Sequence, residues 1–132
     1  MLSQQVRKCL PSEIEQAFEP IVQQRVSAVV VMDDPFFVSQ RNQLVALSSG
    51  HAVAAIYPYR EFTAAGGLMS CGPSLADSLR RVGVYTGRIL KGERPAELPV
   101  LQPAKFELSI NLKTAKALGF SIPETLLAPP TR

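Results

Sequence analysis

The stretch SAVVVMDDPFFVSQRNQLVALSSGHAVAAIY, residues 27–57, contains two short apolar runs separated by a helical pattern. The runs at 27–32 and 52–57 are small or β-branched, without polar alternation, and each stops at a polar residue or a proline. Such runs are typical of strands that are buried on both faces of a parallel sheet. We therefore predict two neighbouring parallel strands.

The segment between the two runs predicts a helix. Asp34 suits the N-cap and Pro35 the first helical position, so we expect the helix over residues 35–48, ended by Gly50. The order strand, helix, strand within about thirty residues predicts a right-handed βαβ unit and an α/β fold.

The flanking sequence predicts further elements. Ser12 and Glu15 form a capping box for a helix with Ile14 and Phe18 on its apolar face, in which Pro20 predicts a kink or an early stop. The other expected elements are a weak strand at 3–10, a strand at 68–71, a helix at 75–90 capped by Ser74, a proline-rich connector at 93–103, an alternating strand at 106–110, a short helix at 112–118 capped by Asn111, and a loosely held tail at 122–132.

The length and composition of the chain are those of one folded domain. The chain has 132 residues, of which 46% are hydrophobic and 19% charged, and its net charge is +3. The basic residues gathered between Arg80 and Arg94 lack interleaved stacking aromatics, so we expect no nucleic-acid partner. No apolar run approaches the roughly twenty residues of a membrane helix. No signal peptide is visible, so a genuine start at Met1 would place the protein in the cytoplasm.

Residues for catalysis or metal binding are sparse. Cys9 and Cys71 are too far apart for a CxxC pair, although one disulfide remains open, and His51 is the single histidine. No nucleotide-binding glycine loop occurs. We therefore expect no catalytic residue, no metal, no cofactor and no enzyme. A small α/β enzyme that uses Asp34 or Glu61 is the third hypothesis.

Polar side chains that follow the predicted strands suit a small ligand. Open α/β sheets bind ligands at the carboxyl ends of their strands, where a guanidinium can hold a carboxylate and a Tyr ring can stack. One of the two adjacent aspartates is more simply an N-cap. The predicted ligand-binding residues are Asp33, Asp34, Tyr59, Arg60, Gly66, Gly67, Ser70 and Gly72.

Two blocks carry a family resemblance: REFTAAGGLMSCGPS at 60–74 and ILKGERPAELPVLQPAKFELSINLKTAKALG at 89–119. Over residues 13–127 the chain resembles ABC transporter substrate-binding proteins of the tryptophan/tyrosine type, which are similar to type I periplasmic binding proteins. The resemblance implies a parallel-sheet, three-layer βαβ lobe of that fold, incomplete because the second lobe is largely missing. It also implies a solute-binding component of a bacterial ABC importer, or a fragment of one, that binds a small organic solute such as an amino acid. A permease partner and a periplasmic location follow from the same resemblance.

The resemblance also implies a division of the chain. Residues 1–66 would belong to the C-terminal lobe, 67–103 would cross into the N-terminal lobe, and 104–132 would return. Family members often carry Tyr where this chain has Cys71. The helix at 75–90 would lose the sheet that it covers, so we expect it to pack on a second copy as a homo-oligomer or to fold back on its own sheet. Its apolar stripe consists of Leu75, Leu79, Val82, Ile89 and Leu90.

A second function class stays open beside the transport hypothesis. The same fold serves as a cytoplasmic ligand-sensing or oligomerisation module, although no DNA-binding helix pair precedes it here.

Overall fold

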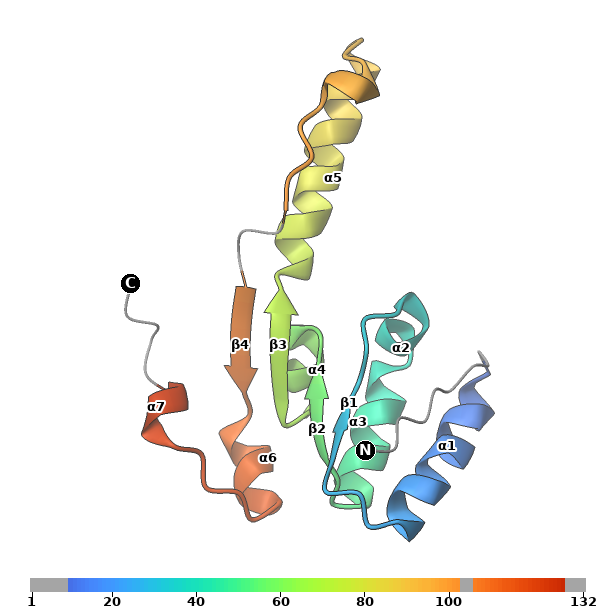
Figure 1. Cartoon of the computed structure of the whole chain (residues 1–132), viewed down its shortest axis with the longest axis vertical. Helices are drawn as coiled ribbons and strands as arrows, with labels where there is room; N and C mark the ends of the chain where they lie inside the picture. The colour runs from blue at the N-terminus through green and yellow to red at the C-terminus, as the bar shows by residue number, and fades with distance from the viewer. Residues whose placement is uncertain (1–9, 103–105, 128–132) are drawn as a thin grey trace.

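A four-stranded sheet organises the chain, whose computed structural model describes residues 10–102 and 106–127 (Figure 1). The strands lie in the order β1-β2-β3-β4. The first three strands are parallel, and β4 is antiparallel to β3. This arrangement confirms the predicted α/β fold and its βαβ unit. The strands are β1 (Ala28–Val30), β2 (Ala54–Tyr57), β3 (Met69–Pro73) and β4 (Phe106–Ile110).

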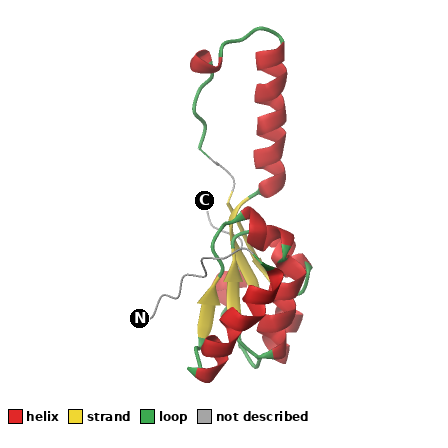
Figure 2. Ribbon diagram, turned by 90° about the vertical axis from the view of Figure 1, so that its right-hand side faces the viewer, coloured by secondary structure: helices red, strands yellow, loops and turns green. Residues whose placement is uncertain are grey.

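The helices that pack against the sheet lie on one of its faces, as Figure 2 shows from the side. α1 packs on α3, while α3 and α4 contact the strands. The helices are α1 (Pro11–Gln23), α2 (Pro35–Ser39), α3 (Arg41–Gly50), α4 (Arg60–Ala64), α5 (Leu75–Leu90), α6 (Leu112–Ala117) and α7 (Glu124–Leu127), with a 3-10 turn η1 at Pro95–Glu97.

The core lies between these helices and the sheet. Its centre is an aromatic pair, in which the Tyr57 ring of β2 stacks on the Phe62 ring of α4 at 4.7 Å between centroids. Burial raises the pKa of the Tyr57 hydroxyl, which donates a hydrogen bond of 3.1 Å to Ser48 Oγ of α3. The core cluster comprises Ile14, Phe18, Val31, Leu44, Val45, Ala55, Tyr57 and Phe62.

The first helix differs from its prediction at its N-cap and at Pro20. It begins at Pro11 with Leu10 as its N-cap, two residues before the expected cap Ser12, and Glu13 accepts the hydrogen bond from the Leu10 amide at 3.3 Å. Pro20 does not end it, because α1 continues to Gln23. The buried side chains of Ile14 and Phe18 hold the helix against the core, which offsets the one backbone bond that a proline removes.

The helix expected over residues 35–48 is two helices. The chain turns at Gln40 between α2 and α3. The Phe36 carbonyl accepts hydrogen bonds from both the Gln40 amide, at 3.0 Å, and the Ser39 hydroxyl, at 2.7 Å, where α2 ends. The break allows Phe36, Phe37 and Val38 to pack against the core.

The predicted burial of β1 on both faces is wrong. β1 is an edge strand whose side chains alternate, with Val31 in the core and Val30 66% exposed. Strand register aligns Val30 with Ile56, Met69 and Ile110 across the sheet. This face is turned toward the viewer in Figure 1, where α4 lies behind β2 and β3. We call it the open face; it consists of Val30, Met32, Ile56, Met69, Cys71, Phe106, Leu108 and Ile110.

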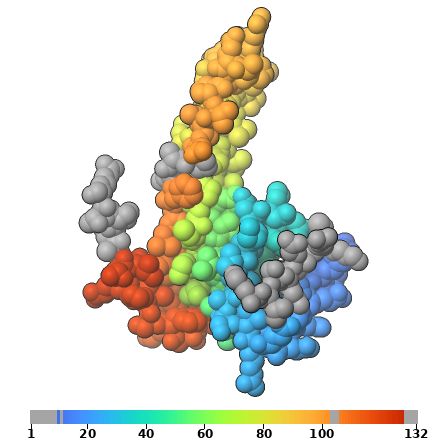
Figure 3. All heavy atoms as spheres, viewed as in Figure 1, coloured from blue at the N-terminus to red at the C-terminus, as the bar shows by residue number. Residues whose placement is uncertain are grey.

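Residues 75–102 form an arm that extends away from the sheet, seen as a narrow projection in Figure 3. Ser74 caps α5 as predicted, accepting a 3.5 Å hydrogen bond from the Asp77 amide. After Gly92 the connector returns along the helix, and the Tyr85 hydroxyl donates to the Pro99 carbonyl. No residue of α5 is buried, so the expectation that its stripe folds back on its own sheet is wrong. The connector lies on one flank of the helix and leaves the stripe uncovered.

The remaining predictions are mixed. The strand at 106–110 and the Asn111 cap of α6 are confirmed, with the Thr114 amide donating to Asn111 Oδ1 at 3.1 Å. The strand expected at 68–71 is β3, which extends to Pro73. α4 and α7 were not predicted, because each is a single turn without helical periodicity. The weak strand at 3–10 falls, except for Leu10, outside the described residues.

Candidate functional site

Asp33 and Tyr59 meet at the carboxyl edge of the parallel strands. Each follows its strand by two or three residues, and the Tyr59 hydroxyl donates a hydrogen bond of 2.7 Å to Asp33 Oδ2. The two side chains come from neighbouring strands, so their contact is a direct result of the parallel register. The structure thus brings together two of the predicted ligand-binding residues at the edge where open α/β sheets bind ligands.

Asp34 has a structural task beside its neighbour. Its Oδ1 accepts a hydrogen bond of 2.8 Å from the Phe36 amide, which makes it the N-cap of α2. The Asp34 carboxylate is therefore partly occupied by the Phe36 amide, whereas the Asp33 carboxylate accepts its hydrogen bond from the Tyr59 phenol.

Arg60 lies at the same edge, in the first turn of α4. Its guanidinium approaches Glu107 of β4 at 3.9 Å and is otherwise largely exposed. Both the Arg60 side chain and Ser109 of β4 line a hollow of about 330 Å³, whose other lining residues are Thr63, Ala64, Ile110, Asn111 and Leu112. Sequence reasoning missed Glu107, because no local pattern connects it with an arginine 47 positions earlier.

Gly72 brings two backbones together near this edge. A Cβ on Gly72 would overlap the Pro58 carbonyl oxygen, which follows β2. The residue therefore fixes the approach of β3 to the segment that carries Tyr59. Its contribution to the site is one of spacing.

The other three predicted residues lie elsewhere. Gly66 and Gly67 precede β3 and so stand at the amino edge of the sheet, opposite Asp33 and Tyr59. Gly66 has a φ of +106°, and its carbonyl accepts a 2.8 Å hydrogen bond from Thr114 of α6. Ser70 is only 1% exposed, beneath α4. These residues are packed into the lobe rather than brought to the edge.

Electrostatics keep the Tyr59 phenol protonated. Burial raises the pKa of Tyr59 to about 12, with further contributions from the hydrogen bond to Asp33 and from the negative charges of Asp33 and Glu61. Glu61 Oε2 is buried and has no hydrogen-bond partner within the described ranges. Two carboxylates thus act on one phenol, and the edge favours a positively charged or hydrogen-donating group.

This coupling gives an expected titration. Tyr59 should ionise near pH 12, followed by phenolate absorbance, and Asp33→Asn should move that step toward the ordinary value of 10.0 because one negative charge is removed. The folded state holds the phenol proton more tightly than the unfolded state. The stability contributed by Tyr59 is therefore complete below pH 10 and is lost as the pH rises from 10 to 12. Tyr59→Phe should lack the step, and an unchanged step in Asp33→Asn would contradict the coupling.

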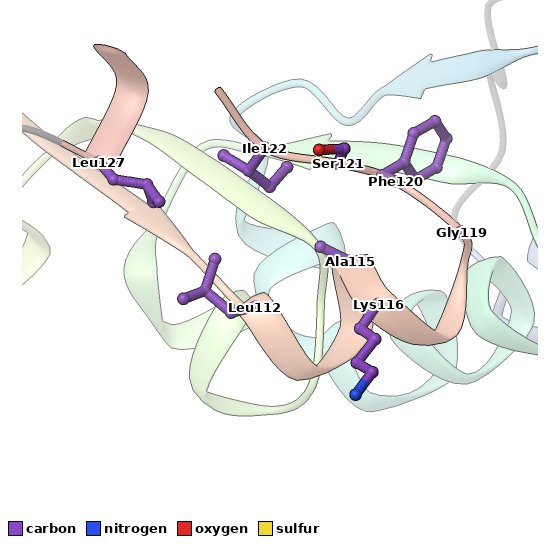
Figure 4. A pocket seen from close by; sticks show the side chains of 8 residues that line it. All are labelled: Leu112, Ala115, Lys116, Gly119, Phe120, Ser121, Ile122 and Leu127. Atoms are coloured by element: carbon purple, nitrogen blue, oxygen red, sulfur yellow. The ribbon is translucent and has the colours of Figure 1, made fainter. Parts of the chain in front are cut away.

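A second hollow, of about 430 Å³, lies between α6 and the segment that follows it. Figure 4 shows Leu112, Ile122 and Leu127 around it, with the Lys116 amine pointing away. Its lining is mostly apolar, with Ser121 and Lys116 as the polar side chains. It is therefore a weaker candidate for a polar ligand than the edge at Asp33.

The described part of the chain shows no metal site, no membrane-spanning helix and no disulfide. No group of three or more His, Cys, Asp or Glu side chains is placed to hold a metal ion there. Within the same residues, no helix is both long and apolar enough to cross a membrane. Cys71 is a free, exposed thiol on the open face, and the other half of the conceivable disulfide, Cys9, lies outside the described ranges.

Solved structures with the same fold are similar to most of this chain. A conserved domain protein from Vibrio cholerae O1 biovar El Tor strain N16961 is 20% identical with a TM-score of 0.79, over 89% of this chain and 39% of its own. The ABC domain in complex with L-Trp from Streptococcus pneumonia is 26% identical with a TM-score of 0.78, over 89% of this chain and 40% of its own. The ligand-free, open structure of a substrate-binding protein with adhesive properties from Clostridium difficile is 20% identical with a TM-score of 0.56, over 86% and 38%.

The chain thus spans about two fifths of the length of these solved structures. No curated protein matches it. The family model described as ABC transporter substrate binding protein matches residues 8–132, nearly the whole chain. With this match and with a lobe that superposes on an ABC domain, the chain belongs to the family of ABC transporter substrate-binding proteins.

Proposed function

We propose that the chain is the solute-binding component, or part of it, of an ABC importer, and that it binds a small organic solute such as an amino acid. The observation that carries the proposal is the Asp33–Tyr59 pair at the carboxyl edge of the parallel strands. Family membership and the L-Trp bound to the similar ABC domain support the same ligand class. An ABC permease is the corresponding partner, and the family's periplasmic location belongs to the same proposal.

The chemistry of the edge suits the two ends of an amino acid. Asp33, beside a second negative charge on Glu61, offers acceptor oxygens to an ammonium group. Arg60 offers a guanidinium that can hold a carboxylate through two hydrogen bonds. Its 3.9 Å contact with Glu107 is long enough to be exchanged for a ligand carboxylate at small cost, because exposed ion pairs contribute little. In this proposal the protein binds and releases its solute unchanged and is not an enzyme.

Substitution of Asp33 tests the site, and the same substitution at the neighbouring Asp34 is the control. Asp33→Asn should weaken the binding of a responsive amino acid roughly 10- to 150-fold, since a hydrogen bond to a charged group is worth about 1.5–3 kcal/mol. Asp34→Asn removes the same charge one residue later but keeps the helix cap, because Asn caps as well as Asp. It should leave both affinity and melting temperature nearly unchanged.

Isothermal titration of the 132-residue chain with L-tryptophan and a panel of other amino acids measures both effects. Equal losses in the two variants would show that general charge, not the Asp33 site, governs binding. A panel without any response would contradict solute binding by this chain.

We also propose that the chain self-associates through α5. The stripe remains exposed in the monomer, with Leu79 and Val82 more than half accessible, and large apolar patches of this kind mark interaction surfaces.

A further inference from the structure

The monomer has two apolar surfaces that no described residue covers. One is the open face of the sheet, where Phe106 is 68% exposed, and the other is the α5 stripe, where Leu79 is 62% exposed.

The α5 stripe has the pattern of a helix that packs on a sheet. Four residues of the stripe, together with Thr86, recur at alternating intervals of four and three residues and produce one straight ridge along α5; the four are Leu75, Leu79, Val82 and Ile89. A sheet that is mostly parallel excludes water from both faces only when helices lie on both. The described helices cover one face, and α5 is the long amphipathic helix that has nothing to cover.

The arm does not lie on the open face of its own sheet. It leaves the end of β3 and extends away from the lobe, as Figures 1 and 2 show from two directions. The connector returns along the flank of α5 that carries Arg81 and Tyr85, where both side chains bond its backbone carbonyls. Those bonds tie the connector to the helix and leave the stripe directed outward.

We propose that α5 of one copy packs its stripe across the open face of a second copy, and that the second copy does the same in return. This inference rests on the self-association proposed above and names the surface that the stripe meets. A two-fold arrangement uses both surfaces of both copies, so the assembly closes as a dimer. Pairing of stripe with stripe would leave both open faces in water.

The contact is large enough for a specific dimer. α5 has 16 residues and is therefore about 24 Å long and about 10 Å wide, which gives a footprint of roughly 240 Å². Two reciprocal contacts involve four such surfaces, or roughly 1,000 Å² in total, which reaches the size of a specific interface.

The oligomeric state tests the proposal. Sedimentation equilibrium of the wild-type chain should give a dimer of twice 14.4 kDa. Val82→Glu places a charge in the stripe and should give a monomer. Val84→Glu makes the same change on the opposite side of α5, since 100° per residue places position 84 about 180° from the stripe, and should remain a dimer. A monomeric wild-type chain would overturn both self-association and the packing proposed here.

A second pair of variants separates the open face from other modes of association. Val30→Glu lies on the open face and should also give a monomer, whereas Ala46→Glu on the outer side of α3 should remain a dimer. A dimeric Val30→Glu chain would leave self-association intact but overturn the packing of α5 on the sheet.

Discussion

Phe62→Ala is expected to lower the free energy of unfolding by about 3–5 kcal/mol, the usual cost of removing a buried phenyl ring. Phe62 is fully buried and stacks on Tyr57 at 4.7 Å, between α4 and the centre of the sheet. Its removal leaves a cavity that a single-turn helix cannot collapse to fill. Small domains are stable by only about 5–15 kcal/mol, so the variant should lose roughly a fifth or more of its stability.

Urea denaturation followed by circular dichroism measures this loss. Phe120→Ala makes the same change at a half-exposed ring beyond α6 and should cost less than about 1 kcal/mol. Phe62→Leu retains most of the volume and should fall between the two. Similar costs for Phe62→Ala and Phe120→Ala would mean that the aromatic pair is not the centre of the core.

Gly72→Ala is expected to cost about 3 kcal/mol or to prevent folding. The added methyl group would overlap the Pro58 carbonyl oxygen, and a backbone atom cannot move aside as the end of a side chain does. β3 would have to separate from the end of β2, and the segment that carries Tyr59 would shift with it. The variant should therefore also lose solute affinity if it folds.

Gly50→Ala is the matched control, because nothing lies within 4 Å of the position that its Cβ would take. It should be neutral or slightly stabilising, since alanine restricts the unfolded chain. Thermal unfolding of the three proteins compares them directly. A Gly72→Ala chain as stable as wild type would show that the two backbones do not meet as closely as described.

Local signals account for most of the fold that the sequence predicts. The apolar runs around Val31 and Ala55, with the Asp34 cap between them, specify strand, helix and strand without long-range information. The parallel register then places Asp33 beside Tyr59, which is why that part of the site is also predictable. The exposure of one face of β1 could not be predicted in this way. An apolar run indicates which side chains a strand would bury, but not whether a helix is present to cover them.

The rest of the site depends on distances along the chain that no local pattern contains. Arg60 finds Glu107 only because β4 returns antiparallel beside β3. The position of Gly66 and Gly67 carried a usable signal, since residues that precede a parallel strand lie at its amino edge. Residue types alone do not tell whether a candidate binding residue lies at the amino or the carboxyl edge of the sheet. The direction of the strand that it precedes or follows does.

The arm interrupts what would otherwise be an ordinary hairpin, and this raises the entropic cost of pairing β3 with β4. The two strands pair along five residues, yet about 30 residues separate them, so closing their loop costs roughly 2 kcal/mol more entropy than a four-residue turn. The approach of Glu107 to Arg60 depends on this closure, because Glu107 lies on β4.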